Sequence, residues 1–84
     1  MGYTIEFSEE FESSMKKLKK KDKALFLQVR KKLIELVNNP EHYKPLKNVL
    51  AGFRRVHFWS FVLIYKIDED VVRIISLEHH DRAY

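Results

Sequence analysis

The chain has 84 residues, of which 45% are hydrophobic and 13% aromatic, and it contains no cysteine. This composition excludes a disordered chain and a disulfide scaffold, and the length fits one small domain spanning residues 1–84. The net charge of +4 at pH 7 favours acidic partners, chiefly nucleic acid and acidic proteins. The first residues lack the basic and apolar regions of a signal peptide, so we expect a cytoplasmic protein.

The N-terminal segment predicts a strand followed by a helix. Apolar and polar residues alternate over residues 2–7, which is typical of a strand with one buried face. Ser8 is then a suitable N-cap, and the acidic residues that follow it favour the positive end of a helix dipole. We expect this helix to end near Lys20 or Lys21. Its apolar face would consist of Phe11, Met15 and Leu18.

A second helix is predicted to begin after Asp22, which is again a good N-cap. It should end at residues 38–40, because the residue before a proline is biased away from helix. The two helices would form an antiparallel hairpin. The predicted apolar stripe consists of Phe26, Val29, Leu33, Leu36 and Val37, flanked by Leu25 and Ile34.

Three β-rich runs follow an irregular stretch at residues 39–52. They span residues 53–58, 61–67 and 71–77, and the middle run is apolar almost throughout, as expected of a central strand. The predicted order is therefore β-α-α-β-β-β. The expected fold class is α+β, with the N-terminal helical hairpin packed on an antiparallel-rich four-stranded sheet.

Alternation within the run at residues 53–58 separates its basic residues. Arg54 shares a face with Val56, whereas Arg55 and His57 point the other way. If the helices cover the Val56 face, Arg55 and His57 stand on the open face of the sheet. Two such groups, two residues apart, are well placed to hold a phosphate.

The C-terminal tail, His-His-Asp-Arg-Ala-Tyr at residues 79–84, carries groups suited to RNA cleavage. Attack by the 2′-hydroxyl needs a base, positive charge for the transition state and an acid for the 5′ oxygen, and His, Arg and Tyr can supply all three without a metal. The alternatives are a flexible polar terminus and a metal site. Since adjacent strand residues point to opposite faces, both imidazoles are not expected on one ion, and we expect no metal and no cofactor.

Two further features have competing interpretations. The lysine-rich run at residues 16–23 is interpreted as a solvated helix face, although it would also attract a nucleic-acid backbone. The aromatic cluster of Phe58, Trp59 and Phe61 could stack a base, but we favour packing at the hairpin turn and the core.

Three segments together resemble the RelE/ParE superfamily of toxins from toxin–antitoxin pairs. They are YTIEFSEEFESSMKKL, PLKNVLAGFRRVHFWSFVLIYKID and ISLEHHDRAY. The sequence is more similar to the RelE/YoeB-like ribonuclease branch than to the gyrase-poisoning ParE branch, which lacks such a tail. The resemblance implies mRNA cleavage in the ribosomal A site, giving a cyclic phosphate, and an antitoxin that wraps the toxin.

The resemblance also implies roles for individual residues. Arg55 and His57 would contact the scissile phosphate, His80 would stabilise charge or act as the acid, and Tyr84 would orient or activate the nucleophile. Further catalytic candidates are His79 and Asp81. The candidates for RNA binding are Arg54, Arg82, Lys47 and Lys44.

One position departs from the family pattern. Many members carry an arginine just before the strand motif that ends in Tyr65, and this chain has Val62 there. The resemblance then implies either that Arg54, Arg55 or Arg82 compensates, or that the activity is low.

Two alternative functions are also compatible with the sequence. One alternative is a toxin that acts on a protein target such as DNA gyrase without cutting RNA. Another is a degenerate regulatory partner that reaches operator DNA only through the antitoxin. In each case a RelB-like antitoxin with an acidic amphipathic helix is the expected partner, with mRNA and the ribosome added if the chain is a nuclease.

Overall fold

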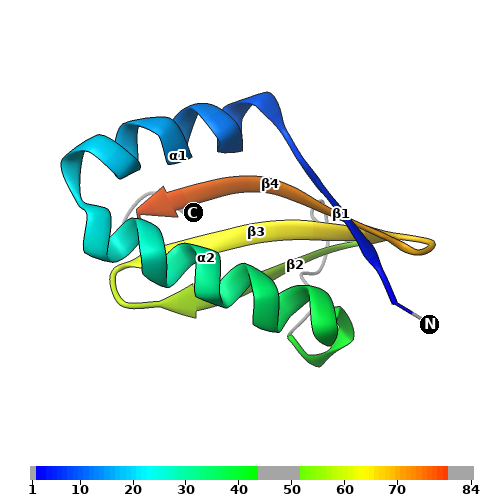
Figure 1. Ribbon diagram of the computed structural model, residues 1–84. Helices are drawn as coiled ribbons and strands as arrows, with labels where there is room; N and C mark the ends of the chain where they lie inside the picture. The colour runs from blue at the N-terminus through cyan, green and yellow to red at the C-terminus, as the bar shows by residue number, and fades with distance from the viewer. Residues whose placement is uncertain (1, 44–51, 80–84) are drawn as a thin grey trace.

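The computed structural model describes residues 2–43 and 52–79, and it has the predicted order of elements (Figure 1). The elements are β1 (Thr4–Phe7), α1 (Glu9–Lys21), α2 (Lys23–Asn38), the short 3-10 helix η1 (Pro40–His42), β2 (Phe53–Phe58), β3 (Phe61–Asp68) and β4 (Val71–His79). The α+β class is therefore confirmed. Within the described ranges, no helix is long and apolar enough to cross a membrane.

Both predicted N-caps are present. The Ser8 hydroxyl accepts a hydrogen bond from the Phe11 backbone N–H at 3.0 Å, and the Asp22 carboxylate accepts one from the Leu25 N–H at 3.1 Å. Each cap satisfies an N–H group that the first turn of a helix leaves without an internal partner. Helix α2 ends at Asn38, two residues before the proline, as predicted.

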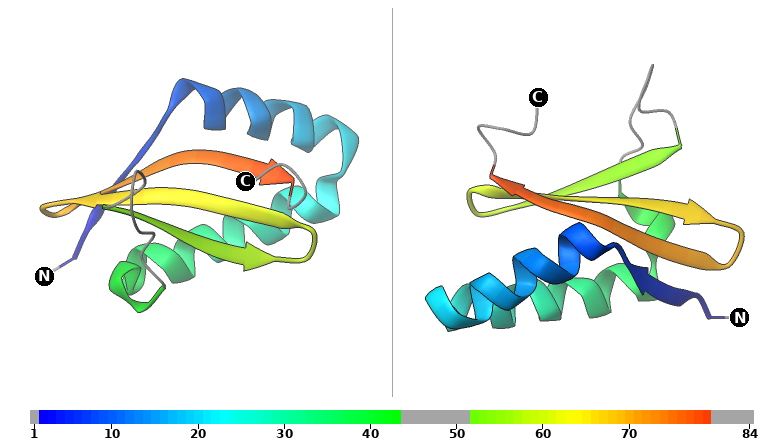
Figure 2. Two further views of the ribbon diagram at one scale, coloured as in Figure 1. Left: turned by 180° about the vertical axis from the view of Figure 1, so that it is seen from behind. Right: turned by 90° about the horizontal axis from the view of Figure 1, so that it is seen from above.

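The sheet has the strand order β1-β4-β3-β2 and is mixed. Strands β2, β3 and β4 are antiparallel neighbours, whereas β1 pairs in parallel with β4. Both helices lie on the same face of the sheet, as the view from above shows (Figure 2). In the described parts of the chain the opposite face therefore has no helical cover.

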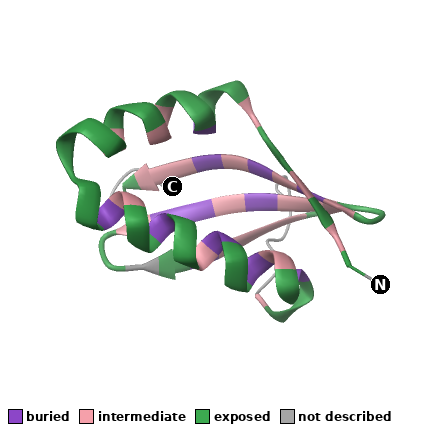
Figure 3. Ribbon diagram, viewed as in Figure 1, coloured by how far each residue is buried: buried purple, intermediate pink, exposed green. Residues whose placement is uncertain are grey.

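The core lies between the two helices and the sheet face that they cover (Figure 3). It consists of Phe11 from α1, of Leu25, Val29, Leu33 and Leu36 from α2, and of Val56, Leu63, Tyr65, Val72 and Ile74 from the sheet. The face that α2 buries is rotated slightly about the helix axis from the predicted apolar stripe. Leu25 is buried in place of Phe26, and Ile34 is 61% exposed, because the sheet contacts the side of α2 that carries Leu25, Val29 and Leu36.

Two of the three C-terminal strands are longer than expected, whereas β2 has the predicted bounds. Strand β3 extends to Asp68 and β4 to His79. The first residue of each connecting turn, Trp59 or Glu69, has a positive φ, at 55° and 56°. Phe61 packs against the core as predicted, but Trp59 is 67% exposed, so the expected packing of the tryptophan is wrong. The Phe58 side chain lies outside what the structure describes.

Candidate functional site

The helix-free face of the sheet brings together side chains from three strands. Strand pairing aligns His57 with Val62 and Val62 with Glu78, which forms one row across the sheet. The next row contains Arg55, Ile64 and Ser76. Because Val56 and Leu63 belong to the core, their strand neighbours Arg55, His57 and Val62 face away from the helices, as predicted for the two basic residues.

Charge is distributed unevenly along this face. At one end Arg73 donates two hydrogen bonds to the Glu6 carboxylate, at 3.1 and 3.2 Å, and its guanidinium lies 3.9 Å from Asp68. At that end the positive charge of Arg73 is therefore balanced by neighbouring carboxylates. The other end carries Arg55 and the exposed His57, with Val62 only 1% exposed between His57 and Glu78. The second end is the candidate site because it brings a guanidinium, an imidazole and the Glu78 carboxylate together on one face.

A bulge in β4 determines which residues reach this second end. Tyr65 pairs with Ile74 while Ile64 pairs with Ser76, so Ile75 is an extra residue without a partner in the ladder. Without it, the alternation from Val72 and Ile74 would turn Glu78 toward the helices. With it, Leu77 packs against the core and Glu78 joins the open face, since one extra residue reverses the alternation beyond it.

Helix α1 is attached to this bulge through its own N-cap. The Ser8 hydroxyl donates a hydrogen bond to the Ile75 carbonyl oxygen, and the Ser8 backbone N–H donates one to the Ile74 carbonyl at 2.9 Å. One residue thus begins the helix and satisfies the backbone at the irregular point of the strand. The bulge is held by the same contact that fixes the entry of α1.

Arg54 lies on the opposite face from Arg55 and His57. Its guanidinium donates a hydrogen bond to the Tyr43 carbonyl at 2.7 Å and a longer one to the Glu41 carbonyl at 3.5 Å. Both acceptors belong to the segment around η1. Arg54 therefore connects β2 to that segment, and its expected contact with RNA stays a prediction.

Two tyrosines attach the same segment from other strands. The buried Tyr65 hydroxyl donates to the Pro40 carbonyl oxygen, and the Tyr3 hydroxyl donates to the Glu41 carboxylate at 2.6 Å. Burial raises the pKa of Tyr65, and the Glu41 carboxylate that accepts its hydrogen bond raises the pKa of Tyr3. Both phenols therefore stay protonated, and remain hydrogen-bond donors, to higher pH than an ordinary tyrosine.

The remaining predicted residues are only partly covered. His79 is exposed at the end of β4, where its imidazole meets the Phe61 ring edge-on at 5.2 Å. Since Phe61 packs on the core, this contact lies on the helix side of the sheet. Outside the described residues lie His80, Asp81, Arg82, Tyr84, Lys44 and Lys47.

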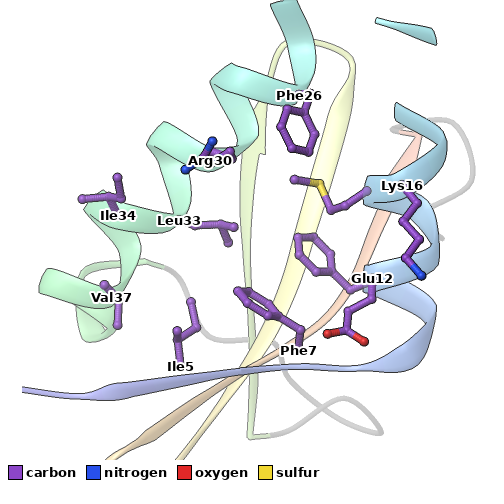
Figure 4. A pocket seen from close by; sticks show the side chains of 11 residues that line it. Ile5, Phe7, Glu12, Lys16, Phe26, Arg30, Leu33, Ile34 and Val37 are labelled. Atoms are coloured by element: carbon purple, nitrogen blue, oxygen red, sulfur yellow. The ribbon is translucent and has the colours of Figure 1, made fainter. Parts of the chain in front are cut away.

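A second concave region lies between the helices and β1 (Figure 4). It is a mainly apolar groove of about 610 Å³. Its lining includes the apolar residues Phe7, Phe26 and Ile34 and the charged residues Lys16, Arg30 and Glu12. Phe7 is 42% exposed and Ile34 is 61% exposed, so substantial apolar surface is open to solvent here.

Sequence reasoning missed Glu78 as a member of the open face. Strict alternation from Val72 would place it among the core-facing residues. The signal was available in the adjacent isoleucines Ile74 and Ile75, where the apolar positions change from even to odd numbers. Such a phase change within a strand is what a one-residue bulge produces.

Comparison with known proteins finds similarity to toxins. Residues 5–84 match the family model described as ParE toxin of type II toxin-antitoxin system, parDE. The chain is 39% identical over 85 residues to a protein named putative toxin RelE4 from Methanocaldococcus jannaschii, covering 98% of this chain and 90% of the relative.

Solved structures share the fold over nearly the whole chain. The toxin–antitoxin complex RelBE2 from Mycobacterium tuberculosis contains a chain with a TM-score of 0.82 and 25% identity, covering 94% of this chain and 99% of that one. A free-state double mutant of Escherichia coli toxin RelE gives a TM-score of 0.77 at 25% identity, covering 99% of this chain and 88% of that one.

Proposed function

This chain belongs to the RelE/ParE superfamily of toxins from type II toxin–antitoxin systems, and from that premise we propose that it is a metal-independent endoribonuclease that cleaves mRNA at the ribosome. The observation that carries the proposal is the placement of Arg55 and His57 side by side on the helix-free face. A guanidinium and an imidazole two residues apart on one strand face can contact the same phosphate, and together they supply positive charge and a titratable proton.

The tail completes the proposed site. His80 stabilises charge or acts as the acid, Tyr84 orients or activates the 2′-hydroxyl, and Asp81 is a secondary candidate, whereas His79 is less suited to the site because it contacts Phe61 on the helix side of the sheet. Arg82, Lys44 and Lys47 bind the RNA backbone, where each cation adds salt-dependent affinity without sequence preference. The exposed Trp59 at the β2–β3 turn offers an aromatic face on which a base can stack.

Val62 stands where many relatives carry an arginine, and this difference bears on which residues supply the positive charge at the proposed site. A valine that is 1% exposed contributes no charge to the site. The positive charge on the phosphate must then come from Arg55, with Arg82 as the second source. Arg54 is less suited to compensate, because its guanidinium is hydrogen-bonded to carbonyl groups on the helix side.

The partner we propose is an antitoxin with an acidic amphipathic helix that lies in the groove between α1, α2 and β1. The M. tuberculosis relative forms a complex with its antitoxin, which makes such a partner the natural one. The groove presents apolar rings from Phe7 and Phe26, while Lys16 and Arg30 outnumber Glu12 among its charged residues. Apolar contact with acidic flanks therefore matches this surface.

The match to a ParE family model supports a second candidate function. In that case the chain acts on a protein target such as DNA gyrase and does not cut RNA. The two candidates differ in their need for the imidazole and phenol groups, because only strand cleavage requires proton transfer.

Primer extension on mRNA in a purified translation system tests the proposal. The wild type should give codon-phased cuts that disappear with His57→Ala and with the double mutant His80→Ala/Tyr84→Phe. Lys31→Ala, an exposed change on α2, is the control and should cut like the wild type. Intact mRNA with translation or growth still inhibited would favour the protein-target toxin instead.

A further inference from the structure

On the basis of the proposed ribonuclease function, we propose that Glu78 is the general base of the reaction and works opposite His57, which lies in the same row of the sheet on the far side of the buried Val62. The carboxylate and the imidazole belong to one row of the sheet, with the buried valine between them. Adjacent strands are about 4.8 Å apart, so the two backbones lie about 10 Å from each other.

This spacing suits the geometry of 2′-hydroxyl attack on a phosphodiester. The entering 2′ oxygen and the departing 5′ oxygen lie on opposite sides of phosphorus in an in-line displacement. Base and acid must therefore approach from opposite sides, with the phosphate between them. Glu78 and His57 flank the buried Val62 in one row of the helix-free face, and Arg55 lies in the next row, where its guanidinium can hold the oxygens of a phosphate placed between the two groups.

The bulge at Ile75 turns the Glu78 side chain toward the helix-free face of the sheet. Without the extra residue, Leu77 would occupy the open face and the carboxylate would point toward the core. Ser8 donates two hydrogen bonds to this irregular part of β4, so the bulge is a supported feature of the strand. Bulges are over-represented beside active sites, where they re-aim side chains. Glu78 is half-buried, which restrains its carboxylate.

The Glu78 carboxylate accepts the proton of the 2′-hydroxyl while the 2′ oxygen forms its bond to phosphorus. The bond from phosphorus to the 5′ oxygen breaks, and that oxygen takes a proton from the His57 imidazolium. The products are a 2′,3′-cyclic phosphate and a 5′-hydroxyl, with Glu78 protonated and His57 neutral until solvent restores both.

The test compares Glu78→Gln with His57→Ala on two short mRNAs bound in the ribosome. One substrate is normal, and the other carries sulfur in place of the bridging 5′ oxygen at the cleaved position. Thiolate leaves without an acid, so this substrate replaces the acid but not the base. Glu35→Gln, an exposed carboxylate on α2, is the matched control.

We expect each site variant to cleave the normal substrate about 100-fold more slowly than the wild type, while Glu35→Gln is unchanged. The sulfur substrate should bring His57→Ala to within about tenfold of the wild type but leave Glu78→Gln slow, since only a missing acid is replaced.

Three results would overturn the inference. If the wild type cuts RNA and Glu78→Gln cuts equally fast, Glu78 is not the base and the ribonuclease function stands. If sulfur rescues Glu78→Gln as fully as His57→Ala, the carboxylate serves the leaving group. If the wild type does not cut RNA at all, the ribonuclease function fails and this inference fails with it.

A second variant covers the case in which Glu78→Gln does not fold, as judged by circular dichroism. Glu78→Asp keeps a carboxylate but withdraws it by one methylene group. It should cleave the normal substrate at least tenfold more slowly than the wild type but faster than a variant without a carboxylate at this position. A rate equal to that of the wild type would contradict a positioned base, because proton transfer depends on hydrogen-bond reach.

Discussion

The hydroxyl of Ser8 donates a hydrogen bond to the carbonyl oxygen of Ile75, so the N-cap of the first helix is also the partner of the bulge in the last strand. The two residues are 67 positions apart in the chain. The contact connects a local event, the start of α1, to the register of β4 and hence to the face on which Glu78 stands. It gives Ser8 a structural importance that a surface N-cap would not have.

Replacing Ser8 with alanine should therefore affect both stability and activity. The Phe11 N–H loses its cap and the Ile75 carbonyl loses its donor, which together should lower the free energy of unfolding by about 2–3 kcal/mol. Cleavage should fall as well, because the bulge that orients Glu78 loses a hydrogen bond. Urea denaturation and the cleavage assay measure the two effects.

The matched control is Asp22→Ala, which removes the N-cap of α2 but touches no strand. It should cost about 1 kcal/mol and leave the cleavage rate of the folded protein unchanged. Equal losses of activity in Ser8→Ala and Asp22→Ala would show that the link to Ile75 has no role in the site.

Local rules predicted much of this structure. The two N-caps, the end of α2 before Pro40 and the central position of β3 follow from interactions within a few residues, so the sequence contains enough information to locate them. The placement of Arg55 and His57 on the helix-free face needed one assumption, that the helices cover Val56, and this proved correct.

The missed features depend on contacts between distant segments. The bulge at Ile75 is a shift in the register between β4 and β3, supported by a hydrogen bond from Ser8, and alternation within β4 alone predicts the wrong face for Glu78. The hydrogen bonds of Arg54 to the segment around η1 are likewise long-range. The rotation of α2 that buries Leu25 is set by how the helix sits on the sheet, which periodicity fixes only to within one residue.

Arg54→Ala should affect stability more than chemistry. The guanidinium bonded to the Tyr43 carbonyl is part of the attachment between β2 and the η1 segment, and hydrogen bonds to charged groups contribute about 1.5–3 kcal/mol. We expect a loss near the lower end of that range, because the bond is only partly buried. Arg55→Ala should instead lower cleavage far more than Arg54→Ala does, and equal losses of cleavage would contradict the separation of the two faces.

Tyr65 should make stability depend on alkaline pH. Burial raises the pKa of its phenol above the ordinary value of 10.0, so above pH 10 the unfolded state loses a proton that the folded state keeps. Folding is then disfavoured as pH rises, by up to about 1.4 kcal/mol per pH unit from this group. Unfolding free energies measured from pH 8 to pH 11 should decline in the wild type.

The variant Tyr65→Phe isolates this contribution. It removes the hydroxyl that donates to the Pro40 carbonyl, which should cost about 1–3 kcal/mol at neutral pH. Its stability should then decline less steeply above pH 10 than that of the wild type. Parallel curves for the two proteins would mean that the Tyr65 phenol ionises equally in the folded and unfolded states.

The groove can be separated from the cleavage site by substitution on a single helix. Ile34 is 61% exposed and lines the groove, whereas Leu27 is 49% exposed on the same helix without lining it. Ile34→Asp should weaken binding of the antitoxin by at least tenfold, since a carboxylate in an apolar contact opposes both burial and an acidic partner. Leu27→Asp should leave the affinity unchanged, and both variants should cleave RNA like the wild type in the absence of antitoxin. Calorimetric titration with the cognate antitoxin measures the difference, and equal affinities for the two variants would place the partner on another surface.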